Sequence, residues 1–333
     1  MIMGIKIGGQ GGGLMIVLER KKSSKLIGLE SLLRRLPQSE VEYEYFNKVY
    51  IQLRTGYEGE LQVDREWVEL SLSNTYYLFH NFETVNPAGN THQIDTLLLT
   101  PNFLWLLEIK NITGRIDIDQ TKNQLIRTSL DGKIESFKNP VDQIERHVHF
   151  LARKIHEWKI NIPVEYAVVI VRDSTIIGTI PANVPIFHLS GLQSKINQLY
   201  KKHSKVNVKS NELEIIKNDL LNMYHRKSWS PSVNVSKLRK GVLCEKCAYK
   251  NVMKFVYGNF ICPICGNKSK VPYYEALLDY RALHSEWISN SDIRDYLGID
   301  SRYAVIRLLK ELNLEFEGTY RNRKYRIPEF IDV

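Results

Sequence analysis

Charged side chains interrupt an aliphatic segment in the middle of the chain. Residues 93–110 read QIDTLLLTPNFLWLLEIK, in which Asp95, Glu108 and Lys110 stand out from the apolar pattern. Both halves have the composition of a β-strand, and the Pro-Asn pair between them is typical of a turn. A buried apolar hairpin has no structural need for these charges, so the three side chains are candidates for chemistry.

The expected hairpin places two carboxylates opposite each other. A tight turn pairs Leu99 with Leu104, and the same register pairs Asp95 with Glu108. Because strand side chains alternate between faces, Lys110 shares a face with both carboxylates. Opposed carboxylates repel, and a divalent cation between them would reverse that penalty, since carboxylate, water and phosphate oxygens are the usual Mg²⁺ ligands. The alternative is a solvated sheet edge at which Lys110 simply neutralises Glu108.

Four sequence blocks around this hairpin resemble the nuclease-related domain, NERD, of bacterial proteins. They are Gly56-Tyr57-Glu58-Gly59-Glu60, Gln93-Ile94-Asp95, Glu108-Ile109-Lys110-Asn111 and Asn139-Pro140-x-x-Gln143. Asp95 with Glu108-x-Lys110 is also similar to the core motif of restriction-endonuclease-like nucleases. The resemblance covers roughly residues 50–170. It implies an α/β fold with a restriction-endonuclease-like mixed sheet flanked by helices, and a metal-dependent nuclease.

The resemblance also implies roles for the matching residues. Asp95 and Glu108 are expected to bind Mg²⁺ or Mn²⁺, with the backbone carbonyl of Ile109 as a further ligand. Lys110 is expected to orient the attacking water and to stabilise charge on the phosphate. Glu60 is a candidate for an extra metal or water ligand, and Gln143 for orienting a phosphate or a water.

Local signals predict where the flanking helices begin. Thr55-Gly-Tyr-Glu58 fits a capping box, which predicts a helix that starts near Gly56, and the alternative role for Glu60 is then a solvated first-turn residue. Asn139-Pro140 predicts the start of a second helix, with an N-cap followed by proline. His147 on that helix is expected to be a surface histidine rather than a ligand.

The composition limits the classes of function that this chain can have. The chain has 333 residues, 43% of them hydrophobic, and a net charge of +9 from 46 basic and 37 acidic residues, which suits a polyanionic partner. No run approaches the roughly 18 apolar residues of a membrane span. The glycine-rich opening lacks a signal-peptide pattern and resembles a tag or a sequence upstream of a natural start at Met15. A cytoplasmic protein without membrane association is expected.

All four cysteines fall in one short segment. Cys244-x-x-Cys247 and Cys262-x-x-Cys265 are separated by fourteen residues, which is zinc-ribbon spacing. Each pair aims two thiolates at one ion, and four thiolates leave no open position. The segment therefore predicts a structural Zn²⁺ site, and two disulfides are the alternative.

The end of the chain predicts a winged-helix-like domain. Residues 292–297 and 302–312 read as two amphipathic helices joined by a turn with Gly298, and residues 316–326 read as a basic hairpin. Phosphate contacts from such a surface would give salt-sensitive affinity for nucleic acid. The alternative is a protein-interaction module. The candidate nucleic-acid-binding residues are Arg302, Arg307, Lys310, Arg321, Arg323, Lys324 and Arg326.

These features divide the chain into six parts. They are a tag-like or disordered N-terminus (1–25), a helical arm packed on the nuclease core (26–54), the nuclease-related domain (55–227), a linker (228–240), the zinc ribbon (241–272) and the winged-helix-like domain (273–333). The favoured function is a Mg²⁺-dependent nuclease that hydrolyses phosphodiester bonds of nucleic acid, with DNA preferred, in DNA processing or defence. The alternative is a catalytically inactive protein that binds nucleic acid or scaffolds a complex with protein partners.

Overall fold

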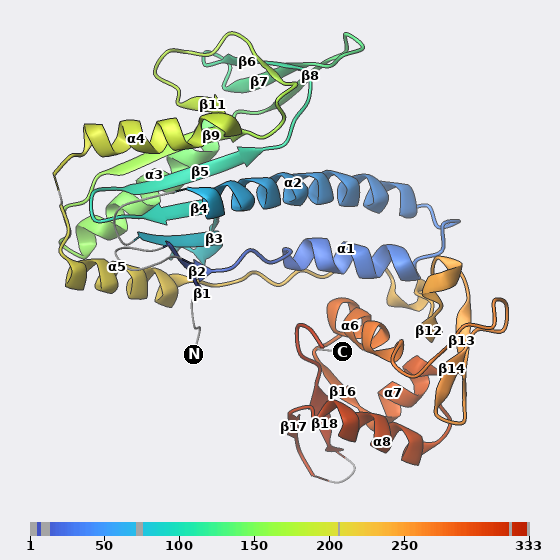
Figure 1. Cartoon of the computed structure of the whole chain (residues 1–333). Coiled ribbons are helices and arrows are strands. Elements are labelled where there is room, and N and C mark those ends of the chain that lie inside the picture. Colours follow the sequence, from blue (N-terminus) through green and yellow to red (C-terminus); the bar gives the residue numbers. More distant parts are fainter. Residues whose placement is uncertain (1–4, 8–13, 71–75, 206, 320–321, 332–333) are drawn as a thin grey trace. The chain divides into compact units, whose positions relative to one another are not determined.

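The computed structural model describes residues 5–7, 14–70, 76–205, 207–319 and 322–331, and it divides into two compact units (Figure 1). The first unit comprises Met1–Lys21 and Arg54–Lys227, and the second comprises Lys22–Leu53 and Ser228–Val333. Each unit is therefore built from two separate stretches of the chain, and helix α2 (Tyr43–Glu69) contributes to both.

A seven-stranded mixed sheet forms the centre of the first unit. Strands β3, β4 and β5 are antiparallel neighbours, whereas β2 pairs parallel to β3, and β9 pairs parallel to both β5 and β11. The strands in spatial order are β1 (Ile5–Ile7), β2 (Leu14–Leu18), β3 (Tyr76–Val85), β4 (Thr91–Leu99), β5 (Leu104–Lys110), β9 (Val164–Ile170) and β11 (Ile186–His188).

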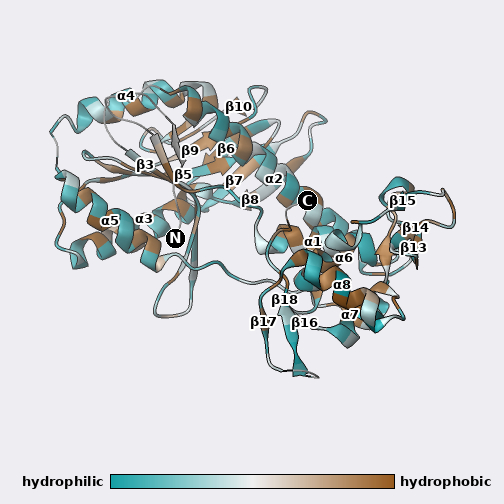
Figure 2. Cartoon of the chain, turned by 60° about the horizontal axis from the view of Figure 1, so that its bottom comes forward, coloured by the Kyte–Doolittle hydropathy of each residue, from teal (hydrophilic) through white to brown (hydrophobic). Residues whose placement is uncertain are grey.

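Helices cover both faces of this sheet. Helices α3 (Pro140–Glu157) and α5 (Ser210–Met223) pack on one face, and α2 and α4 (Leu192–Lys202) pack on the other. Alternation along β4 and β5 supplies both layers, because Leu97 faces the first core and Leu98 the second. The helices carry a hydrophobic and a hydrophilic side, as burial on one side requires (Figure 2). The result is the three-layer nuclease-like α/β fold that the sequence predicts.

A smaller sheet extends the first unit; three of its strands lie between β5 and β9 in the sequence, and the fourth follows β9. Its strands, in the order β10-β6-β7-β8, are β10 (Ile176–Ile177), β6 (Arg115–Asp119), β7 (Gln124–Thr128) and β8 (Ile134–Lys138). Its apolar residues share a core with α3 and β9. Helix α3 then begins as expected, because Asn139 caps the backbone N–H of Val141 and Pro140 follows.

The predicted hairpin register is confirmed. Leu99 pairs with Leu104, and the ladder runs on to Thr96 and Leu107. The prediction that a helix starts near Gly56 is wrong, because α2 runs unbroken from Tyr43 to Glu69 and passes through Gly56. The apparent capping box is an internal turn, in which Glu58 pairs with Arg54 instead.

The expectation that residues 1–25 lie outside the fold is also wrong. Residues 1–4 and 8–13 lie outside the described part of the chain, but β2 is an internal strand of the main sheet. Its aliphatic residues Val17 and Leu18 are buried in the same core as α3 and α5. Helix α1 (Ser24–Arg35), capped by Ser23, follows directly.

The second unit combines the cysteine segment with the C-terminal helices. The cysteines lie in the turns between the strands of a four-stranded sheet. Elements α6, β16, α7, α8, β17 and β18 follow in winged-helix order with a three-stranded sheet β16-β18-β17. The elements of the second unit are β12 (Val242–Leu243), β13 (Val252–Val256), β14 (Asn259–Ile261), β15 (Lys268–Ser269), α6 (Tyr273–Leu283), β16 (Trp287–Ser289), α7 (Asn290–Leu297), α8 (Arg302–Leu312), β17 (Phe316–Glu317) and β18 (Lys324–Arg326). Short 3-10 turns span Val235–Lys237 and Glu245–Cys247 in this unit. A further 3-10 turn spans Leu189–Gly191 in the first unit.

The structure corrects two expectations about how the chain divides into domains. The zinc-ribbon and winged-helix segments share one hydrophobic cluster that runs from Val242 to Ile327, so they are not separate cores. The helical arm expected on the nuclease core instead packs within the second unit, where α1 lies against α6. A buried ion pair fixes that contact, with Arg35 Nε 2.8 Å from Asp279 Oδ2.

Candidate functional site

The two carboxylates of the hairpin lie where the strand ladder opens. Asp95 and Glu108 are the next opposed positions after the Thr96–Leu107 pair, and their residues are 9% and 3% exposed. The Asp95 carboxylate accepts a hydrogen bond from the backbone N–H of Ile109 at 2.8 Å. The Lys110 ammonium lies 2.7 Å from Glu108. The structure therefore brings the three hairpin residues together.

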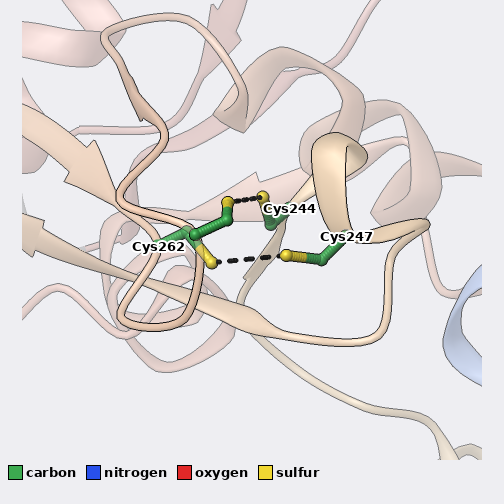
Figure 3. A group of neighbouring side chains, drawn as sticks. Cys244, Cys247 and Cys262 are labelled. Carbon is green, nitrogen blue, oxygen red and sulfur yellow. Dashed lines mark hydrogen bonds between the residues drawn. The ribbon is translucent and has the colours of Figure 1, made fainter.

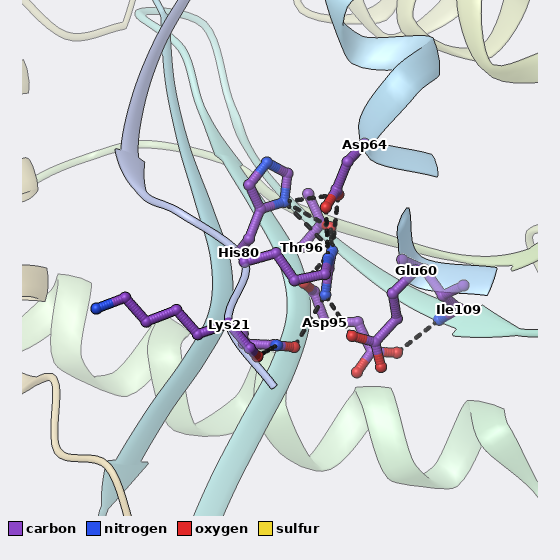
Figure 4. Close-up of polar contacts among 9 residues, drawn as sticks. Lys21, Glu60, Asp64, His80, Asp95, Thr96 and Ile109 are labelled. Carbon is purple, nitrogen blue, oxygen red and sulfur yellow. Dashed lines mark hydrogen bonds and ion pairs between the residues drawn. The ribbon is translucent and has the colours of Figure 1, made fainter. Parts of the chain in front are cut away.

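Glu60 reaches this group from α2. Its carboxylate and that of Asp95 point toward one another (Figure 4), and its side chain is 16% exposed. The approach depends on Gly59, where a Cβ would lie 2.6 Å from the Asn111 Cβ at the end of β5. Glycine is thus needed for α2 to pack this closely. Asn111 also bonds the Thr55 carbonyl of α2 at 2.7 Å.

Arg20 is the hub of the same region, in the sense that one side chain contacts Glu60, Asp64 and the backbone of Asp95. Nothing in the sequence pointed to it. Its guanidinium contacts Glu60 at 2.6 Å and Asp64 at 2.7 Å, and it donates to the carbonyl of Asp95 at 3.0 Å. The side chain is 2% exposed. Because Arg20 follows β2, in the stretch interpreted as a tag, only the three-dimensional pairing of that strand reveals its role.

A residue with a left-handed backbone in β3 lies beside Arg20. Asn81 of β3 has a left-handed backbone with φ of 49° and lies opposite Asp95 in the β3–β4 register. Its side-chain oxygen accepts from Arg20 at 2.9 Å, and its amide donates to the Lys21 carbonyl. Thr96 accepts a further bond from Arg20 at 3.0 Å. Asparagine tolerates this conformation better than most residues, so the left-handed backbone is built into the sequence.

Burial and mutual repulsion make the carboxylates hard to ionise. Burial, and then the neighbouring Asp95 charge, raise the pKa of Glu108 to about 8 and that of Glu60 to about 7. Burial also raises the pKa of Asp95. Burial opposes the charge of Lys110, but Glu108 and Asp95 outweigh it and raise its pKa. Lys110 and Arg20 lower these pKa values without offsetting burial, and an additional cation would favour the ionised carboxylates further.

The carboxylates do not form a closed cage. Among the described residues, the group of three or more potential ligand side chains whose atoms all lie within 4.8 Å is the four cysteines. An ion at Asp95 and Glu108 would therefore also draw on water or phosphate oxygens, which is the usual coordination of Mg²⁺. The donor set fits a hard divalent cation in chemistry, and Lys110 remains 32% exposed beside it.

Two candidate residues on α3, Gln143 and His147, lie in different surroundings. Gln143 is partly exposed on α3, and no hydrogen bond joins its side chain to the carboxylates within the described ranges. His147 is not the expected surface histidine, because it is 2% exposed and its Nδ1 lies 3.0 Å from Nδ1 of His92. Burial lowers the pKa of His147 to about 4.

The four cysteines converge on one point. Figure 3 shows Cys244, Cys247 and Cys262 of this group. The Sγ atoms of Cys244 and Cys265 are 3.6 Å apart, and those of Cys247 and Cys262 are 3.8 Å apart. All four are free thiols. Tetrahedral zinc with Zn–S bonds of about 2.3 Å requires sulfurs about 3.8 Å apart. Backbone N–H groups, first that of Cys265, lower the pKa of Cys262 to about 7, which favours a thiolate ligand. The cluster therefore has the size to hold zinc.

The basic candidates of the winged-helix segment have different surroundings. Arg302, Arg307 and Lys310 are exposed on α8, and Lys324 is exposed on β18. The other two described candidates are engaged, because Arg323 lies 4.3 Å from the Phe316 ring centroid and Arg326 lies 3.5–3.6 Å from Glu315 and Glu286. Arg321 lies outside the described residues.

Comparison with known proteins settles which family this site belongs to. Residues 55–171 match the family model of the nuclease-related domain, NERD. This segment is a nuclease-related domain. No curated protein and no solved structure matches the chain. The NERD segment contains α2 from Thr55 onward, the hairpin and α3, so the Glu60, Asp95, Glu108 and Lys110 group lies wholly inside it. Strand β2 and Arg20 lie outside it.

The family assignment gives the coarse function. A nuclease-related domain implies an interaction with nucleic acid. Within the described ranges, no helix has both the length and the apolar character needed to cross a bilayer.

Proposed function

We propose that this protein is a metal-dependent nuclease that hydrolyses phosphodiester bonds of nucleic acid, with DNA as the preferred substrate. The observation that carries the proposal is the buried group of Glu60, Asp95 and Glu108 beside Lys110. Burial raises the pKa values of all three carboxylates, and the charge of Asp95 raises those of Glu60 and Glu108 further. A purely structural sheet edge gains nothing from such an arrangement.

Asp95 and Glu108 would hold Mg²⁺ or Mn²⁺, with Glu60 and the Ile109 carbonyl as further candidates. When bound, the ion would polarise the phosphate and lower the pKa of a water molecule. The chain itself supplies orientation and charge. The Ile109 N–H fixes one oxygen of Asp95, and Glu108 anchors Lys110 at 2.7 Å. From there the partly exposed ammonium can donate to a phosphate oxygen and stabilise charge that develops during hydrolysis. Gln143 remains a candidate for orienting water or phosphate.

The second unit would serve the nuclease by binding substrate. Exposed cations on α8 and β18 suit phosphate contacts, which add affinity without sequence preference. The zinc would be structural, because four thiolates leave no coordination position for a substrate. A cytoplasmic role in DNA processing or defence, with protein partners, is consistent with this arrangement and is part of the proposal.

A cleavage assay tests the proposal. The full chain is incubated with labelled single- and double-stranded DNA and with RNA, with Mg²⁺, with Mn²⁺ and without added metal. Cleavage should require metal and should be nearly abolished in Asp95→Asn and Glu108→Gln, whereas Lys110→Ala should lose turnover but retain substrate binding. Glu69→Gln, an exposed carboxylate at the end of α2, is the matched control and should cleave normally. Full activity of Asp95→Asn would defeat the assignment.

One observation favours a second candidate function. Among the described residues, the oxygens of the three carboxylates do not all lie within 4.8 Å of one another, as the four cysteine sulfurs do. A protein that keeps the fold but binds nucleic acid or scaffolds a complex without cleavage would satisfy the same geometry. Binding by the wild type with no cleavage of any substrate in either metal would select this candidate.

A further inference from the structure

A pocket of about 630 Å³ lies within the second unit, apart from the carboxylate group. Its wall is formed by the end of α1, the beginning of α2 and the turn that follows Cys247. All of its lining residues belong to Lys22–Leu53 or to Ser228–Val333. The volume suits a small organic ligand.

The lining has an excess of positive charge. Four cations line the pocket, Lys22, Arg34, Arg239 and Lys250, against one carboxylate, Glu30. Glu30 is engaged by Lys22 at 2.7 Å. Arg34 is likewise paired, with Asp279. The charges that remain for a ligand are therefore those of Arg239 and Lys250.

Arg239 is held in place without being neutralised. Its guanidinium donates to the carbonyls of Arg34 at 2.6 Å and Lys250 at 3.0 Å. Burial and then the charge of Arg35 lower the pKa of Arg239. Lys250 is exposed and has no ion-pair partner in the part of the chain that the structure describes. An anion in the pocket would relieve the repulsion between these cations.

Three tyrosines supply aromatic surface beside the cations. Tyr43 and Tyr50 stand seven residues apart on α2 and thus on one helical face. Tyr249 comes from the turn after Cys247, where it and Ala248 have left-handed backbones with φ of 59° and 48°. Its hydroxyl donates to Glu275 at 3.2 Å, which anchors the ring. All three rings are partly buried.

We propose that this pocket binds one nucleotide unit, with its phosphate against Arg239 and Lys250 and its base against the tyrosine rings. Bases stack on aromatic side chains irrespective of sequence, and basic side chains next to such platforms follow the phosphate backbone. A carboxylate ligand or an acidic peptide would use the cations but gain little from three rings. The nucleotide unit can belong to a single strand or be a free nucleotide. The inference is independent of cleavage by the carboxylate group.

Fluorescence anisotropy with the full chain tests the pocket. The probe is a labelled single-stranded DNA of about ten nucleotides, which is within the span of known single-strand sites. No divalent metal is added, so cleavage does not contribute. Lys250→Glu should weaken binding by about ten-fold and lower the slope of log affinity against log salt by about one. Tyr50→Ala should weaken binding by about ten-fold and leave that slope unchanged.

Matched controls separate the pocket from the rest of the surface. Lys246→Glu changes the same charge in the same turn, and Tyr45→Ala removes a 67% exposed ring from the same helix, but neither residue lines the pocket. Both should bind like the wild type. Equal binding by pocket and control variants would overturn the proposal. Loss in Lys250→Glu with none in Tyr50→Ala would also overturn it, because the surface would then attract any polyanion.

Competition with AMP distinguishes the two sources of the ligand. Displacement of the probe by AMP, weakened in Tyr50→Ala, would show that the pocket accepts a free nucleotide. No displacement, with the variant pattern above, would show that it takes a nucleotide only within a strand. Unfolding curves that match the wild type for Lys250→Glu, an exposed position, keep the comparison independent of folding.

Discussion

Replacing Arg20 by glutamine should destabilise the first unit and disable its carboxylate group. The guanidinium holds Glu60 and Asp64 at 2.6 and 2.7 Å, while Arg20 itself is 2% exposed and the two carboxylates are 16% and 21% exposed. Glutamine can keep a hydrogen bond but provides no charge. Breaking a buried ion pair by removing one partner costs about 3–5 kcal/mol. We expect about 3 kcal/mol, because the carboxylates keep some contact with water.

Urea unfolding followed by tryptophan fluorescence measures this loss. Trp67 and Trp105 are buried in the first unit and report on it. Arg115→Gln is the matched control, since Arg115 pairs with Asp117 at 3.0 Å but is 47% exposed, and an exposed pair contributes at most about 1 kcal/mol. Cleavage should also fall in Arg20→Gln, because Arg20 orients Glu60 and the backbone of Asp95. If Arg20→Gln unfolds at the same urea concentration as Arg115→Gln, the assignment of Arg20 as the hub is refuted.

The other predictions concern zinc, helix packing and pH. Purified protein should contain about one Zn²⁺ per chain by elemental analysis, and Cys262→Ser should lose it and unfold the ribbon; metal-free protein with disulfides would contradict this. Gly59→Ala should reduce cleavage because its Cβ would meet Asn111 at 2.6 Å, whereas Gly56→Ala, with open space around its Cβ, should gain about 0.5–1 kcal/mol of stability. The pKa of His147 is about 4 in the folded protein, below its unfolded value of about 6.5. Its contribution to the free energy of unfolding is therefore fully present above pH 6.5 and is lost as the pH falls. As pH falls from 6.5 to 4, the wild type should lose up to roughly 3 kcal/mol relative to His147→Phe in urea titrations, and parallel curves would exclude a buried neutral histidine.

Local pattern was enough to predict the hairpin. The turn and the alternation of side chains fix the register, so the positions of Asp95 and Glu108 follow from spacing alone. The cysteine cluster was predictable for a similar reason, because each pair needs only a short turn. These features depend on residues that are close in sequence or joined by one simple loop.

Long-range packing could not be predicted from the sequence. Arg20 acts on residues forty or more positions away, and nothing adjacent to it encodes that contact. The capping-box pattern at Thr55 was misleading, because the residues from Tyr43 onward already continue the helix through it. His147 was placed on the surface because its burial depends on a partner, His92, in another element.

The alternation of the chain between its two units has a consequence for synthesis on the ribosome. Helix α1 and the start of α2 emerge early, but their partner helix α6 is separated from α1 by the whole of Arg54–Lys227. Arg35 must wait for Asp279, 244 residues later, before its charge is paired. Domains normally fold as units in the order in which they emerge. Here the apolar face of α1 stays without its native partner while the nuclease-related domain completes, so nascent chains longer than about 54 residues and shorter than about 280 should be the ones that engage chaperones.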